Sequence, residues 1–316
     1  MISKTRTKHT SKQRQFESLG TFNEITIFDC FDDALLDSAV NRVQEIDDTM
    51  SAFKPLSDIS RLNQSAGERP VPINPETLYL LSYAKKISEM SEGAFDITIR
   101  PLVELWGISK KLNFIPTQGE IDEAKKLVNF KDLELDKING TSFLKKQGQA
   151  VDLGGIAKGY AAEEVKRILI EGGVKSSIIN LGGNAITIGT QPDNQPWFVG
   201  VQNPTAPAGE FFGMISSVNK TIVTSGCNER FFMKDGVRYH HIIDPRTGKP
   251  AQSGLLSVTL VCDNSVDADA LSTAVFVLGI EKSIGLLKKY EADAIFATED
   301  CNVFVTDGIK DRFKMK

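Results

Sequence analysis

Most of the candidate chemistry in this chain lies in four stretches between Val151 and Ala274, at residues 152–160, 180–184, 240–248 and 269–273. The first two are rich in glycine, the third holds a histidine pair before a turn, and the fourth places a carboxylate near a hydroxyl. Glycine turns and a lysine can bind phosphate, and carboxylate and hydroxyl oxygens suit Mg²⁺. Together the stretches predict Mg²⁺-assisted phosphoryl transfer on a nucleotide cofactor that contains a pyrophosphate.

Gly154 and Gly155 stand directly before a predicted helix over 156–171. A helix that begins after such a turn leaves amide donors unpaired at its positive end, and Lys158 in its first turn could reach the same phosphate. The spacing matches neither the P-loop nor the dinucleotide-binding glycine loop. A tight turn with an exposed lysine is the alternative explanation of this motif alone.

Asp269 and Thr273 lie four residues apart on a predicted helix, so their oxygens project from one face. A carboxylate plus a hydroxyl suits Mg²⁺, which completes its shell with water and substrate phosphate. Asp152, or a carbonyl of the turn at 154–155, could add a third oxygen. In the alternative, Asp267 or Asp269 caps the helix and Thr273 bonds to the backbone.

His240 and His241 end a predicted strand over 237–243, just before a turn with Pro245 at its second position. Because side chains of a strand alternate, only one of the two can face a site. That histidine could act as a general base or contact a phosphate. A purely structural histidine is the alternative.

Two aromatic positions lie at element ends, where a side chain could stack on a ring system. They are Phe53 and the Phe95 of Ala94-Phe95-Asp96. Packing in the core is the alternative for each of them.

The secondary-structure pattern places helices mainly in the first half and strands mainly in the second. Short links between the strands favour antiparallel pairing, so we expect an α+β fold rather than a doubly wound sheet. The expected helices cover 32–50, 75–92, 119–128, 156–171, 267–278 and 280–290. The expected strands cover 22–28, 176–181, 185–189, 197–202, 211–218, 220–225, 237–243, 256–261, 292–298 and 301–305.

With 316 residues, the chain can form one large domain or two intertwined subdomains. We expect residues 18–316 to be the folded part and residues 1–17 to be a disordered tail, because the N-terminal segment is polar and basic. The basic residues of this tail are Lys4, Arg6, Lys8, Lys12 and Arg14.

Charge and composition argue against several classes of protein. The net charge of -4 provides no basic surplus for nucleic acid. No apolar run of about 18 residues is present, so no membrane span is expected. The four cysteines lie far apart without a CxxC spacing, which argues against zinc and a disulfide framework. Without a signal peptide or lipobox we expect a cytoplasmic protein, and an exported lipoprotein only if a leader was removed.

These motifs resemble the ApbE family, the FAD:protein FMN transferases. The resemblance rests on the stretches 152–160, 241–248 and 269–273, and on Ser225-Gly226 followed by Glu229-Arg230-Phe231-Phe232. Softer agreement extends upstream, so the resemblance covers roughly residues 18–310. Two positions depart from the family pattern. Leu19-Gly20-Thr21 stands for the usual Met-Gly-Thr, and Cys227-Asn228 stands where an aromatic is common, which would put a thiol near the site.

The resemblance implies an α+β fold and Mg²⁺-dependent transfer of FMN from FAD to a threonine hydroxyl of an acceptor flavoprotein, with AMP leaving. It implies metal binding by Asp269, Thr273 and the Gly155 carbonyl, and catalysis by His241. We expect Asp244 to assist catalysis by positioning the loop. The expected acceptor motif is Asp-(Gly/Ala)-x-(Ser/Thr)-(Gly/Ala)-(Ala/Thr)-(Ser/Thr). The implied FAD contacts are Phe53, Ala94, Phe95, Asp96, Asp152, Lys158 and Ile243.

Two other functions fit the same residues. Water in place of the threonine would make the protein a metal-dependent FAD pyrophosphatase that yields FMN and AMP. A protein that binds FAD without turning it over would be a flavin carrier.

Overall fold

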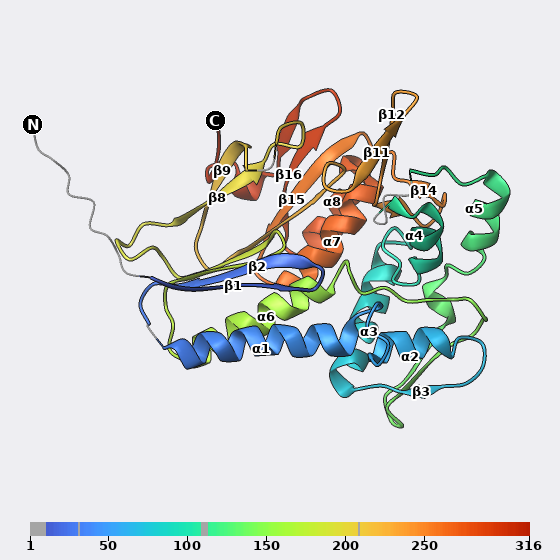
Figure 1. Cartoon of the computed structure of the whole chain (residues 1–316). Coiled ribbons are helices and arrows are strands. Elements are labelled where there is room, and N and C mark those ends of the chain that lie inside the picture. The colour runs from blue at the N-terminus through green and yellow to red at the C-terminus, as the bar shows by residue number, and fades with distance from the viewer. Residues whose placement is uncertain (1–10, 31, 109–112, 208) are drawn as a thin grey trace, which may run out of the picture.

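A mixed assembly of antiparallel sheets and helices makes up the computed structural model, which describes residues 11–30, 32–108, 113–207 and 209–316 (Figure 1). The main sheet within these residues has the strand order β1-β2-β6-β7-β10-β15-β16-β17, and each neighbouring pair is antiparallel. Its strands are β1 (Lys12–Ser18), β2 (Thr21–Ile27), β6 (Ser177–Leu181), β7 (Asn184–Ile188), β10 (Thr221–Gly226), β15 (Leu255–Cys262), β16 (Asp293–Thr298) and β17 (Val303–Val305).

Strand β1 corrects the expected tail at residues 1–17, because residues 12–17 pair along their whole length with β2. Leu19 and Gly20 turn the hairpin with positive φ values of 55° and 69°. Arg14 is neutralised by Asp33, at 2.9 Å, and by Asp37, at 2.7 Å. These partners are distant in sequence, so the basic residues suggest a solvated tail. In the structure, Lys12–Ser18 form an edge strand whose Arg14 is ion-paired. Residues 1–10 lie outside the described residues.

Helices cover one face of the main sheet, with α6 packed between α1 and α7 (Figure 1). The side chains buried between them form the largest apolar core, which runs from Ile25 of β2 to Phe296 of β16. The helices of the described residues are α1 (Asp33–Met50), α2 (Asp58–Gln64), α3 (Pro75–Met90), α4 (Arg100–Trp106), α5 (Gln118–Lys125), α6 (Ala157–Glu171), α7 (Ser265–Leu278) and α8 (Ile280–Lys289), with short 3-10 turns at Phe130–Asp132 and Asp307–Ile309.

A small sheet packs on the opposite face of the main sheet. Its order is β18-β9-β8, and Ile215 of β9 is buried with Ile222 of β10 and Val261 of β15 in a separate cluster. The strands are β8 (Trp197–Gln202), β9 (Phe211–Ser217) and β18 (Phe313–Met315).

The remaining elements gather beside the end of the main sheet. Helices α4 and α5 pack against each other there and share an apolar cluster with the hairpin of β11 and β12 (Figure 1). The expected strand over 237–243 is divided in two, because the chain bends at His241. The strands of this region are β11 (Phe231–Lys234), β12 (Val237–His240), β13 (Ile243–Asp244) and β14 (Lys249–Pro250). A separate sheet of order β3-β5-β4 contacts α2 and α3, and its strands are β3 (Val71–Pro72), β4 (Leu133–Asp136) and β5 (Thr141–Leu144).

Helices α6 and α7 approach each other most closely at Gly159. A Cβ atom at this position would lie 2.8 Å from Asp269 Cβ and 2.8 Å from the Ser265 carbonyl carbon, and closer still to the carbonyl oxygen. Only glycine allows this approach. It brings the first turn of α6 against Asp269 of α7.

The cap of α7 decides between the two interpretations of its acidic residues. Asn264 accepts hydrogen bonds from the amides of Val266 and Asp267, so neither Asp267 nor Asp269 caps the helix. Asp267 instead accepts a hydrogen bond from Tyr83, at 2.6 Å. Asp269 is therefore available to the site.

The predicted α+β class is confirmed. Among the described residues, no helix is both long enough and apolar enough to cross a membrane.

Candidate active site

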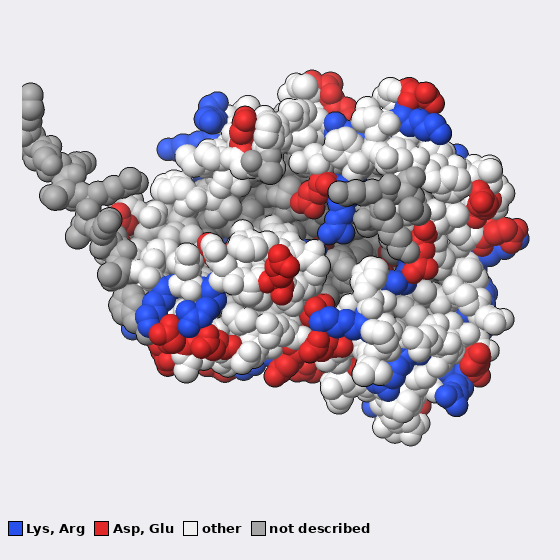
Figure 2. Space-filling model, viewed as in Figure 1, with Lys and Arg blue, Asp and Glu red and all other residues white. Residues whose placement is uncertain are grey.

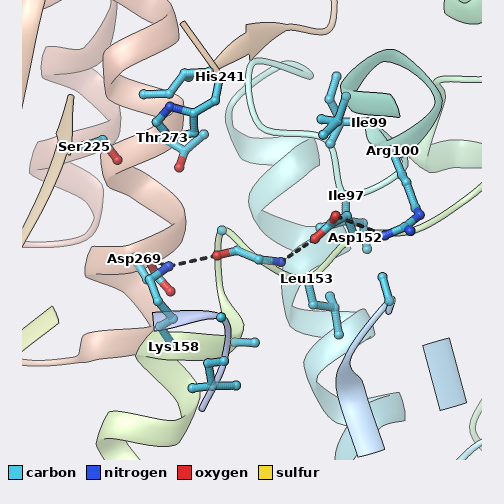
Figure 3. A pocket seen from close by; sticks show the side chains of 18 of the residues that line it. Ile97, Ile99, Arg100, Asp152, Leu153, Lys158, Ser225, His241, Asp269 and Thr273 are labelled. Carbon is cyan, nitrogen blue, oxygen red and sulfur yellow. Dashed lines mark hydrogen bonds and ion pairs between the residues drawn. The ribbon is translucent and has the colours of Figure 1, made fainter. Parts of the chain in front are cut away.

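A cavity of about 480 Å³ opens where the β1–β2 hairpin, the start of α6, the end of β10 and the bend at His241 converge. Its volume lies in the range of small-molecule and cofactor sites, which is roughly 300–1,000 Å³. Figure 3 places Thr273, Ser225 and His241 at one side of the pocket and Asp152 with Arg100 at the other. On the face seen in Figure 2, acidic and basic side chains lie close together.

Asp152 fixes the glycine turn that leads into α6. Its Oδ1 accepts a hydrogen bond from the Gly154 amide at 2.8 Å, and its own amide donates to the Ile97 carbonyl at 2.8 Å. The other carboxylate oxygen lies 3.4 Å from an Arg100 nitrogen. Dashed lines in Figure 3 mark the contacts of the Asp152 carboxylate with the Gly154 amide and with Arg100. Asp152 thus lines the cavity, but its oxygens already hold the turn and Arg100 in place.

Lys158 and Asp269 meet at the start of α6. The Lys158 ammonium donates to the Gly154 carbonyl at 2.9 Å and lies 3.3 Å from Asp269 Oδ1. Asp269 Oδ2 accepts the Gly159 amide at 2.9 Å. The buried carboxylate is thereby aimed at the positive end of α6.

Gly155 and Thr273 complete this corner of the cavity. A Cβ at position 155 would lie 3.6 Å from Thr273 Oγ1 and 3.2 Å from a ring carbon of Phe95, so the glycine backbone passes close to the hydroxyl. Both residues line the cavity with Asp269. The predicted metal ligands are therefore together in space.

The donor set at this corner fits Mg²⁺. Carbonyl, hydroxyl and carboxylate oxygens are its usual ligands, and the Lys158 ammonium already lies between a carbonyl and the carboxylate, as a cation would. No group of three or more His, Cys, Asp or Glu side chains suited to a metal occurs in the described part of the chain. A site with one carboxylate leaves coordination positions for water and substrate phosphate.

His241 lines the cavity, and its hydrogen bonds define the tautomer of its imidazole ring. Its Nδ1 lies 3.3 Å from the Arg230 carbonyl, and its backbone amide donates to the same oxygen at 3.1 Å. Because a carbonyl only accepts, Nδ1 carries the hydrogen and Nε2 of the neutral ring keeps its lone pair. Burial, followed by the charge of Arg230, lowers the pKa of His241 to about 4. The imidazole is thus neutral at pH 7.

His240 points away from the cavity, as strand alternation predicts. It is buried, its Nε2 lies 3.0 Å from the Ala251 carbonyl, and its ring packs edge-on against Phe276. His240 is therefore the structural histidine of the pair.

Asp244 does not line the cavity, although Ile243 and Pro245 on either side of it do. Its carboxylate accepts hydrogen bonds from the Arg246 amide and guanidinium, each at 2.9 Å. The carboxylate is therefore occupied in holding the turn. It can position the loop but does not reach the reacting atoms.

The opposite wall carries the predicted flavin contacts. Ala94, Phe95 and Asp96 line the cavity, and the ring of Phe95 is buried. Asp96 accepts hydrogen bonds from the Thr98 amide and hydroxyl, both at 2.7 Å, and burial raises the pKa of its carboxyl. The buried carboxylate of Asp96 thus stabilises the loop that leads from Asp96 to Thr98.

Phe53 does not pack in the core, because 74% of its surface is exposed at the rim of the cavity. One face of its ring is covered by the Arg100 guanidinium, 4.6 Å from the ring centroid. The ring is therefore held over the cavity mouth.

A comparison with protein families identifies the family of this chain. The model of the ApbE family matches residues 19–296 of the 316. The chain belongs to the ApbE family. Curated relatives named FAD:protein FMN transferase include one from Klebsiella pneumoniae, 34% identical over 89% of this chain and 88% of its own length. Another, from Treponema pallidum, is 35% identical over 89% of this chain and 82% of its own length.

Solved ApbE structures share the fold. The ApbE protein of Thermotoga maritima has a TM-score of 0.88 at 30% identity and covers 96% of this chain and 99% of its own. The flavin transferase ApbE of Vibrio cholerae has a TM-score of 0.84 at 26% identity, with coverages of 96% and 100%.

The two departures from the ApbE pattern have different positions. Leu19, Gly20 and Thr21 line the cavity, so the leucine takes the methionine's place at the wall. Cys227 is buried, does not line the cavity and accepts a hydrogen bond from Arg238 at 3.1 Å. The thiol therefore lies behind the cavity wall, directly after Ser225 and Gly226, and does not open into the cavity.

Sequence reasoning assigned no role to several polar residues that line this cavity in the ApbE fold. Arg100, Ser225 and Arg230 each lie at a cavity wall. Ser225 shares a hydrogen bond of 2.8 Å with Ser272, whose hydroxyl donates to the Asp269 carbonyl at 2.8 Å. These two hydrogen bonds connect β10 to the turn of α7 that carries Asp269. In the sequence, Ser225 and Arg230 are marked only by the motif that contains both of them, and Arg100 is not marked by any motif.

Proposed function

We propose that this chain catalyses Mg²⁺-dependent transfer of FMN from FAD to a threonine hydroxyl of an acceptor flavoprotein, with release of AMP. Its curated relatives carry the name FAD:protein FMN transferase. The cavity combines an anion-binding helix start, a magnesium-type donor set and a neutral histidine, which are the parts that such a transfer requires.

The metal would be held by Asp269, Thr273 and the Gly155 carbonyl. When bound, Mg²⁺ neutralises and orients the diphosphate of FAD. Lys158 adjoins this place and can contact the same diphosphate. Phe53 offers an exposed aromatic face for a ring system, whereas Phe95 packs in the core and contributes, with Ile243, to the apolar wall.

In the proposed step, the threonine oxygen attacks the phosphorus on the FMN side of the diphosphate. The bond from this phosphorus to the bridging oxygen breaks, and AMP leaves with that oxygen. The hydroxyl proton passes to Nε2 of His241. The product is a phosphoester between the threonine and FMN.

The observation that supports this mechanism best is the contact between His241 Nδ1 and the Arg230 carbonyl, at 3.3 Å. It directs the unprotonated nitrogen away from the backbone, in a cavity that Asp269 and Thr273 also line. A proton acceptor and a metal site within one cavity fit attack by a hydroxyl on a phosphorus.

Mass spectrometry of a flavoprotein carrying the acceptor motif, co-expressed with this chain, tests the proposal. We expect the mass of FMN, less one water, on a threonine, with equimolar AMP from the purified reaction in Mg²⁺ and FAD. The matched control replaces the acceptor threonine by valine. Free FMN with an unmodified acceptor would identify a pyrophosphatase instead, and bound FAD without AMP release would identify a carrier.

A further inference from the structure

The described residues that line the cavity include more carboxylates than cations. Six of these residues are carboxylates, whereas three have side chains with permanent positive charge. The three are Arg100, Lys158 and Arg230. A diphosphate that enters such a cavity is repelled unless cations are available to it.

Two of these three cations are already paired. Arg100 lies 2.9 Å from a Glu104 oxygen and 3.4 Å from Asp152, and only 12% of its side chain is exposed. Lys158 lies 3.3 Å from Asp269. Both cations therefore stabilise carboxylates of the protein before any substrate binds.

Arg230 differs from both. No carboxylate of the described residues lies within ion-pair distance of its guanidinium, although the residue lines the cavity. It is exposed at the rim, so solvent or a ligand can reach it. An uncompensated arginine at the mouth of an acidic cavity suits an anionic ligand.

The backbone links Arg230 to the proposed base. The Arg230 carbonyl accepts both Nδ1 and the amide of His241, at 3.3 Å and 3.1 Å. The guanidinium and the imidazole thus extend from two chain segments that are hydrogen-bonded to each other. A group that reacts beside His241 is therefore near Arg230 as well.

We propose that the Arg230 guanidinium binds the non-bridging oxygens of the phosphoryl group that is transferred, and so acts as a further catalytic residue. This inference rests on the proposed function. During attack, negative charge spreads over those oxygens, and the planar guanidinium can donate two hydrogen bonds to them. Lys158 and the metal site lie at the helix start, so Arg230 would supply positive charge from the side of His241.

Variants of the full chain test the proposal. In Arg230→Ala we expect the turnover number for FMN transfer to fall by about a hundredfold to a thousandfold, the usual cost of losing one donor to a transition-state oxygen. Arg230→Lys should recover part of this loss, because it keeps the charge without the fork. Arg238→Ala is the matched control, since Arg238 stacks on Phe231 and contacts Cys227 outside the cavity.

Binding of the two product nucleotides gives a second measurement. Fluorescence titration should show FMN binding about tenfold more weakly to Arg230→Ala than to the original chain, while AMP, followed by calorimetry, binds within about twofold. Unchanged AMP binding also shows that the variant is folded.

Three results would overturn the role of Arg230: transfer by Arg230→Ala within about threefold of the original chain, an equal loss in Arg238→Ala, or equal weakening of FMN and AMP binding. Failure of the original chain itself to transfer FMN or release AMP would count against the proposed function. The comparison of FMN with AMP binding would still test the phosphate contact in that case.

Discussion

Helices α6 and α7 cross at Gly159, and we predict that Gly159→Ala destabilises the protein. Helix propensity alone would predict the opposite, because alanine favours a helix more than glycine does. Gly159 lies in the first turn of α6, where alanine would ordinarily stabilise a helix by about 1 kcal/mol. In Gly159→Ala, however, the added methyl group would meet Asp269 Cβ and the Ser265 backbone. The Ser265 backbone cannot rotate away as a flexible side chain could, so the two helices must separate.

The magnitude follows from those contacts. Overpacking of a close-packed interior costs about 1–3 kcal/mol, and a clash with backbone belongs at the upper end. Separation also weakens the hydrogen bond from the Gly159 amide to Asp269, worth about 1.5 kcal/mol or more for a charged acceptor. After subtraction of the propensity gain, we expect a net loss of about 3 kcal/mol in the free energy of unfolding. Binding of Mg²⁺ should weaken too, because Asp269 moves.

Urea denaturation followed by circular dichroism measures the effect. Gly285→Ala is the matched control, because Gly285 is an exposed glycine of α8 whose added Cβ would have no atom within 4 Å. That variant should be more stable by up to about 1 kcal/mol. If Gly159→Ala were as stable as the original chain, or stabilised like Gly285→Ala, the close approach of α6 and α7 described above would be refuted.

Three further predictions concern the site. Asp269→Asn should abolish Mg²⁺-dependent release of AMP while the unfolding midpoint shifts little, because the amide oxygen can still accept the Gly159 N–H; full turnover would remove Asp269 from the metal site. Lys158→Met should bind Mg²⁺ several-fold more tightly in calorimetric titrations without FAD, since the ammonium no longer neutralises Asp269, and weaker binding would contradict the pairing. His241, whose pKa is lowered to about 4, is mostly deprotonated at pH 5 and above. Activity should therefore persist as the pH falls from 7 to 5 and drop near pH 4, whereas an acid limb near 6.5 would show an unshifted imidazole.

The long elements could be predicted because they follow local rules. The span of α1 follows from its apolar spacing and from Asp32, which accepts the Ala34 amide at its start. Helix α3 begins with Pro75 in its first turn. Helices α2 and α4 were not predicted, since each has only seven residues and too few turns for a periodic pattern. Strand β1 was not predicted because its stabilising carboxylates lie on α1.

The site could be predicted only in part. Asp269 and Thr273 share a helix face by spacing, but the Lys158–Asp269 contact joins residues 111 apart and depends on the fold. Asp244 stands in a motif with His241, yet only the structure shows that Arg246 occupies its carboxylate. Motif membership therefore located the region, whereas the individual roles required three-dimensional contacts.

The contact between Lys158 and Asp269 has a thermodynamic consequence for ligand binding. One ammonium cannot neutralise Asp269 and bind a diphosphate at the same time. In the proposed reaction, a divalent ion that takes over Asp269 frees Lys158 for FAD, so each ligand raises the affinity for the other by the same factor. When FAD is scarce, the enzyme would then bind the metal less tightly, and its own lysine would serve as the counter-ion of Asp269 until both ligands arrive.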